Sequence, residues 1–232
     1  MFTFAPMYAH FVNLLFPNVC FGCSQPLVNG EEHICAMCIS ELPLTGYIGW
    51  KENPVAKRLW GRVNLIHASS FMHFMKDSMV QRLLHNLKYK GQKEIGFALG
   101  KLLGNELLEN EKLNDVDYVV PVPMYPRKER KRGYNQAWTI AKGVSDSISK
   151  PIEQNSLVKV LDTRSQTRLN RWMRWENQQE IFALKNASNY EGKHILLVDD
   201  VITTGSTLEA CTTLMNQVDG CRVSVATLAC AS

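Results

Sequence analysis

The residues with the clearest chemical potential lie in one stretch, 195–207, with the sequence ILLVDDVITTGST. Its aliphatic start predicts a short buried strand, with Asp199 and Asp200 at the carboxyl end. A loop of small hydroxyl residues around Gly205 follows, and a helix should begin near Leu208. The N–H groups of such a loop and the helix N-terminus favour a phosphate group, whereas paired carboxylates suit ribose hydroxyls or Mg2+. The pattern therefore predicts a sugar phosphate site.

The same stretch resembles the phosphoribosyl pyrophosphate (PRPP) signature of the type I phosphoribosyltransferases. In that family the acidic pair contacts the ribose hydroxyls, so Asp199 and Asp200 are the candidate catalytic residues, with Mg2+ accompanying PRPP. The 5′-phosphate is assigned to five loop residues: Thr203, Thr204, Gly205, Ser206 and Thr207. The alternative is an ordinary strand–turn–helix with a capping Thr or Ser, which explains one hydroxyl but not two carboxylates.

Four cysteines have the spacing of a metal site. Cys20 and Cys23 form one C-x2-C pair, and Cys35 and Cys38 form another after eleven residues. Two such turns can complete a tetrahedral shell of four thiolates around Zn2+, and since no position stays open the zinc should be structural. Two disulfides are the alternative. The odd total of seven cysteines favours a reducing cytoplasm instead.

A second candidate anion-binding segment follows the predicted strand 117–123. Residues 127–132 carry a net charge of +4, within a predicted loop, 124–136, that leads into a helix. In type I phosphoribosyltransferases the loop at this point cradles pyrophosphate. The alternatives are a solvated charge run and a contact with the phosphate backbone of nucleic acid. The resemblance assigns three of its residues to PRPP: Arg127, Lys128 and Arg132.

Residues 159–176 form another positive segment, with net charge +3 and arginines among two tryptophans, Trp172 and Trp175. The family places a mobile hood over the active site here. Such residues could clamp a diphosphate, stack on a base or bind single-stranded nucleic acid, and packing on the core is an equal alternative. The rest of the chain is net −3, so the positive charge is local.

The elements around these motifs indicate an α/β fold, and the resemblance implies a type I phosphoribosyltransferase-like, mostly parallel sheet flanked by helices. With 232 residues the chain can bury one sizeable core and carry a small satellite. We expect a zinc-knuckle domain over 1–45, a connector over 46–62 and a phosphoribosyltransferase-like domain over 63–232. Strands are predicted at 65–74, 157–160 and 222–229, and helices at 77–89, 93–108 and 135–149.

Neither the N-terminus nor any apolar run of the sequence predicts a targeting signal or a membrane span. Residues 2–16 are apolar but lack the basic leader and cleavage site of a signal peptide, so a short packed helix is expected. No apolar run reaches the roughly 18 residues that would cross a bilayer. The sequence predicts a cytoplasmic protein without membrane insertion.

The order of these motifs resembles the ComF proteins, a bacterial group named for natural competence. The resemblance implies a role in DNA uptake and transformation, with PRPP or a related sugar phosphate as ligand. It implies single-stranded DNA and a competence helicase or another DNA-uptake protein as partners. It supplies no reaction. The motifs are the four-cysteine knuckle, LKYKG at 87–91, PVP at 121–123, RGYNQ at 132–136, TRSQTRL at 163–169 and LLVDDVITTGST at 196–207.

Two functions remain open from the sequence. As an enzyme, a phosphoribosyltransferase, the protein would displace pyrophosphate from C1 of PRPP, with Mg2+ and the basic loop stabilising the departing group. No general base can be assigned. As a non-catalytic module, it would bind PRPP as a signal or single-stranded DNA as an adaptor. Binding through many phosphates weakens steeply with salt, which separates the two.

Overall fold

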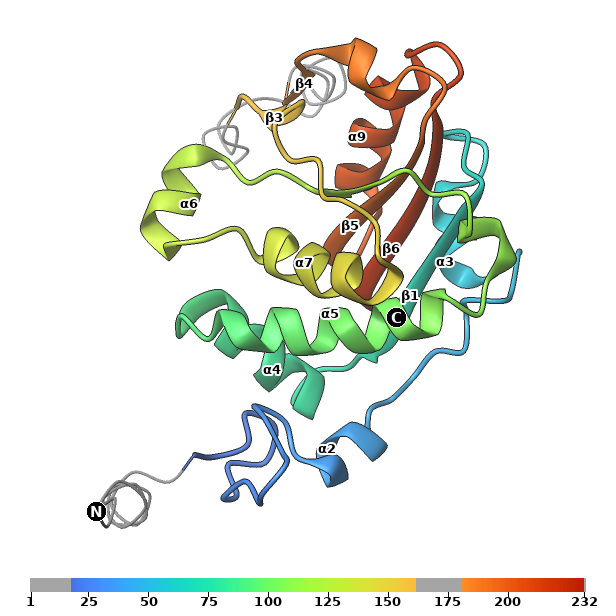
Figure 1. The fold of residues 1–232 in the computed structure, drawn as a ribbon. Helices are drawn as coiled ribbons and strands as arrows, with labels where there is room; N and C mark the ends of the chain where they lie inside the picture. The colour runs from blue at the N-terminus through green and yellow to red at the C-terminus, as the bar shows by residue number, and fades with distance from the viewer. Residues whose placement is uncertain (1–17, 162–180, 232) are drawn as a thin grey trace, which may run out of the picture.

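The computed structural model describes residues 18–161 and 181–231, and Figure 1 shows their arrangement. The expected N-terminal helix at 2–16 lies outside the described residues. Most of the expected hood, including Trp172 and Trp175, does so as well.

A four-stranded parallel sheet forms the centre of the molecule, with the strand order β1-β6-β5-β2. Its central strand β5 is completely buried from Ile195 to Val198, which explains the run of aliphatic residues there. The predicted α/β class is confirmed. The strands are β1 (His67–Phe74), β2 (Tyr118–Pro121), β5 (His194–Ile202) and β6 (Arg222–Ala231).

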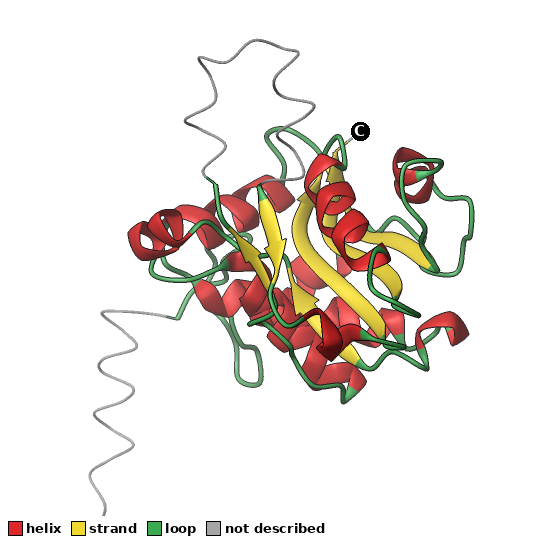
Figure 2. Cartoon of the chain, turned by 90° about the horizontal axis from the view of Figure 1, so that it is seen from above, coloured by secondary structure: helices red, strands yellow, loops and turns green. Residues whose placement is uncertain are grey.

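Helices cover both faces of this sheet (Figures 1 and 2). One face packs against α4, α5 and α7 through residues such as Leu83, Leu99 and Ile140. The other packs against α3 and α9 through residues such as Leu59 and Leu208. The bounds are α3 (Pro54–Leu59), α4 (Met79–Tyr89), α5 (Lys93–Leu107), α7 (Gln136–Ile148) and α9 (Ser206–Asn216).

Two smaller units complete the described chain. The four-cysteine segment carries one short helix, α2 (Ala36–Ser40), and its buried cysteines belong to the same core cluster as Leu83 and Leu87 of α4. A short antiparallel pair, β3 (Leu157–Lys159) with β4 (Phe182–Leu184), stands apart from the main sheet. Single helical turns lie at Glu111–Leu113 and Ala187–Tyr190.

The basic segment predicted as a loop is instead a helix, α6 (Pro126–Arg132). Pro126 stands in its first turn, where a missing N–H costs nothing, and Arg, Lys and Glu are good helix formers. Gly133 ends the helix with a left-handed φ of 86°. The predicted helix at 135–149 is confirmed as α7.

Helices α5 and α7 cross at glycines that leave no room for a side chain. A Cβ on Gly143 would lie 2.2 Å from the carbonyl oxygen of Phe97, and one on Gly100 would lie 2.3 Å from that of Ile140. Backbone cannot yield as a flexible side chain can. These contacts fix the position of α7 against α5, and hence that of the segment that precedes α7.

A Gly143→Ala variant should therefore be destabilised by about 1–3 kcal/mol, the usual cost of overpacking a tight contact. Urea unfolding followed by circular dichroism would measure it. Asn105→Ala, at an exposed position of α5, is the control. An equal midpoint for the two variants would contradict a tight crossing.

Candidate functional site

The predicted anion loop joins the end of β5 to α9. Gly205 has a φ of 82° and, as the N-cap residue of α9, offers no side chain to the first N–H groups, although that of Ser206 donates to Thr204 Oγ1 at 3.4 Å. A small cavity of about 40 Å³ opens here, lined by Asp199 and residues 201–208. A helix N-terminus beside a cavity of this size suits one phosphate group. All five predicted loop residues, 203–207, line it.

Two arginines from the region of α3 donate hydrogen bonds to backbone carbonyl oxygens of the anion loop. Arg58 donates hydrogen bonds from Nη1 to the carbonyl oxygens of Thr203 (2.8 Å) and Ile202 (3.4 Å), and from Nη2 to that of Ala231. Arg62 donates to the carbonyl oxygen of Thr204 at 3.1 Å. Because the carbonyls are engaged on this side, the N–H groups are left for a ligand. These positions had been expected to form a connector.

Arg58→Met should lower the affinity for ribose 5-phosphate about tenfold, because the loop loses hydrogen bonds that fix it before the ligand arrives. Affinity for inorganic diphosphate, which would use other residues, should stay unchanged. Calorimetric titration of both ligands measures this difference. Lys57→Met is the matched control, and an equal loss for both ligands would indicate general destabilisation instead.

The acidic pair lies near the carboxyl end of β5, as predicted, and the strand continues to Ile202; Asp199 pairs with Thr227 of β6. Asp200 N–H donates to Oδ1 of Asp199 at 2.8 Å, and Lys88 Nζ lies 2.8 Å from Oδ2 of Asp200. Burial, followed by the neighbouring charge of Asp200, raises the pKa of Asp199 to about 7. The pair thus gathers negative charge at one place, and the ammonium of Lys88 already lies against it.

A larger cavity of about 280 Å³ adjoins the loop cavity, and Asp199 and Thr207 line both. Its wall combines the acidic pair with four basic side chains from three elements, α4, α6 and β3. Lys128 and Arg132 are there, as predicted, whereas Arg127 is exposed on α6 and is not among the lining residues. The further lining residues include Lys88, Tyr89, Gln136 and Lys159.

Gln136 contributes a hydrogen-bond donor to this cavity. Its side chain is 2% exposed, and Arg132 Nη1 donates to its Oε1 at 2.7 Å, which fixes the orientation of the amide. The amide nitrogen, Nε2, has no partner among the described residues. A buried donor without a partner is costly, and an anionic oxygen of a ligand would satisfy it.

Three of these cavity residues were not assigned from the sequence as site residues: Lys88, Gln136 and Lys159. Lys88 lies in the last turn of α4. Both Lys88 and Gln136 do lie in the short motifs LKYKG and RGYNQ, which were noted only for their order along the chain. Those two motifs were the sequence signal that could have identified Lys88 and Gln136 as site residues.

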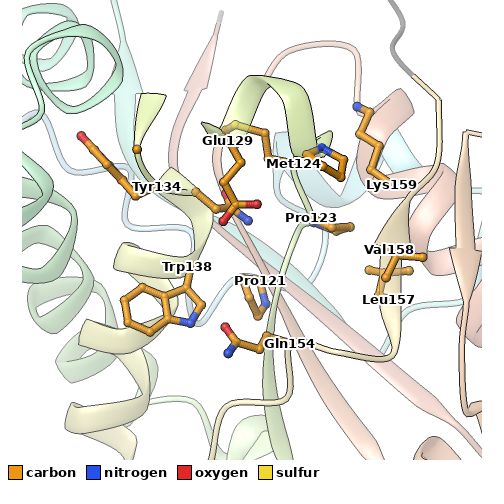
Figure 3. Close-up of a pocket in the computed structure, with 13 residues that line it drawn as sticks. Pro121, Pro123, Met124, Glu129, Tyr134, Trp138, Gln154, Leu157, Val158 and Lys159 are labelled. Carbon is orange, nitrogen blue, oxygen red and sulfur yellow. The ribbon is translucent and has the colours of Figure 1, made fainter. Parts of the chain in front are cut away.

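A third cavity, of about 370 Å³, shares Pro123, Met124, Asn135 and Lys159 with the larger anion cavity. Figure 3 shows Tyr134 and Trp138 on one side and residues of β3 on the other. Aromatic, amide and carboxylate groups line it, and the last is Glu129. A second, less charged molecule would fit beside the anion.

The four cysteines meet as predicted, with their sulfur atoms all within 4.8 Å of one another. Sγ of Cys23 and Cys35 lie 3.8 Å apart, close to the edge of a tetrahedron with Zn–S bonds of about 2.3 Å. The amides of Gly22 and Cys35 donate to Cys20 Sγ at 3.3 and 3.2 Å. The cluster has the donors and closed geometry of a structural zinc site.

One further group has the distances of a hydrolytic triad but lies at the opposite end of the sheet. His194 Nε2 is 2.9 Å from Ser224 Oγ, and its Nδ1 is 2.6 Å from Asp115 Oδ1. Both Ser224 and His194 are completely buried, and neither lines a cavity among the described residues. The group links β5 and β6 to the segment before β2.

Comparison with protein families gives two matches. Residues 106–231 match the phosphoribosyl transferase domain, and residues 11–48 match the double zinc ribbon domain. The second stretch holds the four clustered cysteines, enough for one zinc ion. The first stretch covers β2, α6, the acidic pair and the anion loop.

Several curated proteins are similar over most of the chain. The DNA utilization protein YhgH of Salmonella typhi is 28% identical over 84% of this chain and 89% of its own length. Competence protein F of Haemophilus influenzae is 26% identical over 86% of this chain and 91% of its own length. Competence protein ComFC of Bacillus subtilis is 28% identical over 82% of this chain and 75% of its own length. The resemblance to the ComF proteins is confirmed.

In the described part of the chain, no helix has the length and apolar character to cross a membrane.

Proposed function

This chain belongs to the phosphoribosyl transferase domain family, and from that premise we propose that it binds PRPP or a closely related sugar phosphate. The observation that carries the proposal is the joining of two cavities along Asp199 and Thr207. One offers the N-terminus of α9, and the other offers the acidic pair and four basic side chains. The helix N-terminus suits the phosphate, the acidic pair suits the ribose, and the basic side chains suit the diphosphate.

Each part of PRPP has proposed partners. Residues 203–207 hold the 5′-phosphate, and Asp199 and Asp200 accept hydrogen bonds from the ribose hydroxyls. The diphosphate lies against Lys128 and Arg132, supported by the cavity residues that the sequence did not assign. Mg2+ would arrive with the diphosphate, and the oxygen donors of the acidic pair suit it. The four-cysteine cluster holds Zn2+ as a structural ion.

The same site supports a transfer reaction when a second substrate is present. The bond from C1 to the diphosphate oxygen breaks, and the diphosphate leaves with the electron pair. The nucleophilic atom of the acceptor forms the new bond to C1 and gives its proton to water. The acceptor would lie in the adjoining cavity beside Tyr134 and Trp138, which shares Lys159 with the diphosphate region.

The biological setting follows from the names of the relatives, which concern competence and DNA utilization. We propose that this protein acts in the cytoplasm during DNA uptake and transformation, with a helicase or another DNA-uptake protein as partner. A second candidate function, binding of single-stranded DNA as an adaptor, has its own support. Arg127, Arg130 and Lys131 are exposed on α6 outside the cavity, which is more charge than a diphosphate needs.

Calorimetric titration of PRPP with Mg2+ into the wild type tests the proposal, followed by assays for diphosphate release. Saturable binding supports it, and release with an acceptor makes the protein an enzyme. Absence of PRPP binding would overturn it. An oligothymidylate titration at low and high salt tests the second function, because binding along a DNA backbone falls steeply with salt. A variant with Arg127, Arg130 and Lys131 changed to Ala should lose DNA and keep PRPP.

A further inference from the structure

Lys88 enters the anion cavity from an anchored position. It follows Leu87, which is completely buried, and the carbonyl oxygen of Leu87 accepts a hydrogen bond from the hydroxyl of Tyr134. The side chain of Lys88 is 25% exposed and its ammonium lies 2.8 Å from Asp200. The end of α4 therefore delivers a positive charge to a defined place, even though the lysine side chain itself can turn.

The ion pair conflicts with the use of Asp200 by a ligand. Oδ2 of Asp200 is one of the oxygens that a ribose hydroxyl or Mg2+ would need, and the ammonium already contacts it. An arriving diphosphate meets the opposite problem, since two adjacent carboxylates repel it unless a cation intervenes. Both difficulties disappear if the same ammonium turns from the carboxylate to the diphosphate.

We propose that Lys88 exchanges partners when the ligand binds. In the free protein it pairs with Asp200, and in the complex it donates to the diphosphate while Asp200 becomes available to the ribose and to Mg2+. Lys88 lines the same cavity as Lys128, Arg132 and Gln136, so a rotation of its own side chain is enough. This inference rests on the proposed function.

The exchange makes cation and diphosphate binding cooperative. Mg2+ alone must displace the ammonium of Lys88, whose ion-pair partner among the described residues is Asp200, so it should bind the free protein weakly. Once diphosphate has taken the ammonium, Asp200 is open to the metal. By linkage, each of the two ligands should raise the affinity for the other by about 5-fold to 150-fold.

The test compares the wild type with Lys88→Met, which keeps most of the aliphatic stem. Calorimetry with Mg2+ alone should show binding to Lys88→Met at least about tenfold tighter than to the wild type. Inorganic diphosphate alone should bind Lys88→Met at least about tenfold more weakly. Lys90→Met, at the exposed C-cap of α4, is the matched control and should change neither affinity.

The outcomes separate the two proposals. If the wild type binds PRPP and Lys88→Met matches it for both Mg2+ and diphosphate, the exchange is overturned and the proposed function stands. If the wild type binds neither PRPP nor diphosphate, the proposed function is overturned. Opposite changes in the two affinities, confined to Lys88→Met, establish the exchange.

Discussion

A Cys38→Ser variant should lose its zinc and at least about 3 kcal/mol of stability, and its affinity for PRPP should fall as well. Structural zinc contributes on the order of 10 kcal/mol in isolated zinc fingers at neutral pH, so a fraction of that effect is ample. Cys38 is 2% exposed and belongs to the core cluster that contains α4. Loss of the metal should therefore be felt beyond the cysteine segment.

The weakening of the anion site follows from the position of α4. Arg82 donates from Nε and Nη2 to the carbonyl oxygen of Gly22, between the first two cysteines, at 3.4 Å each. A Cβ on Gly22 would lie 3.1 Å from Met79 Sδ, which shows how closely the first turn of α4 approaches the cluster. The other end of the same helix presents Lys88 to Asp200.

Three measurements check this prediction: zinc content, thermal unfolding, and calorimetry with PRPP. Cys23→Ser separates metal loss from lost packing, because Cys23 is exposed and contributes a ligand but little core. Cys221→Ser, outside the cluster, should keep its zinc and is the control. Normal PRPP affinity in zinc-free Cys23→Ser would contradict the link through α4.

The parts of the site that the sequence could predict are those written in neighbouring residues. Two motifs carry their chemistry in fixed spacing: the acidic pair with its hydroxyl-rich loop, and the two C-x2-C turns. In the structure the residues of each motif lie together, at two separate places. Arg58 contacts Thr203 from 145 positions away along the chain. No local pattern encodes such a contact, because it depends on how α3 packs beneath the loop.

Helix α6 shows a different limit. Its sequence, PRKERKR, has no apolar residues to give a helical period, and no residue of the helix is buried. Hydrophobic periodicity therefore could not indicate it. Intrinsic propensity, Pro126 at the start and Gly133 at the end were the informative signals. Its position at the rim of the cavity places Lys128 and Arg132 inside and Arg127 outside.

The double variant Asp199→Asn with Asp200→Asn should lose PRPP affinity by at least about 100-fold. Hydrogen bonds to charged groups contribute roughly 1.5–3 kcal/mol each, and the ribose would lose two of them. Calorimetry with Mg2+ and PRPP measures the loss. Thr213→Val, on α9 away from the two anion cavities, is a control that should bind normally. Wild-type affinity in the double variant would remove the acidic pair from the site.

The single variant Asp199→Asn should gain stability at pH 8 even as binding suffers. The pKa of Asp199 is raised to about 7 in the folded protein, above its ordinary value of 3.8, by burial and by Asp200. A raised carboxyl pKa favours folding below pH 4 and opposes it as the pH rises through 7. Asn carries no charge and should escape that loss.

Urea unfolding of wild type and Asp199→Asn at pH 4, 6 and 8 measures the effect. The advantage of Asn should be near zero at pH 4, grow towards pH 7 and then level off. The side chain is isosteric and its Oδ1 can still accept from the amide of Asp200, so packing is preserved. An advantage that is independent of pH would show that the buried charge is not its cause. A variant that is less stable at pH 8 would show that Lys88 outweighs the burial. The pattern expected here is that of a site whose charge is kept for its ligand at the expense of the fold.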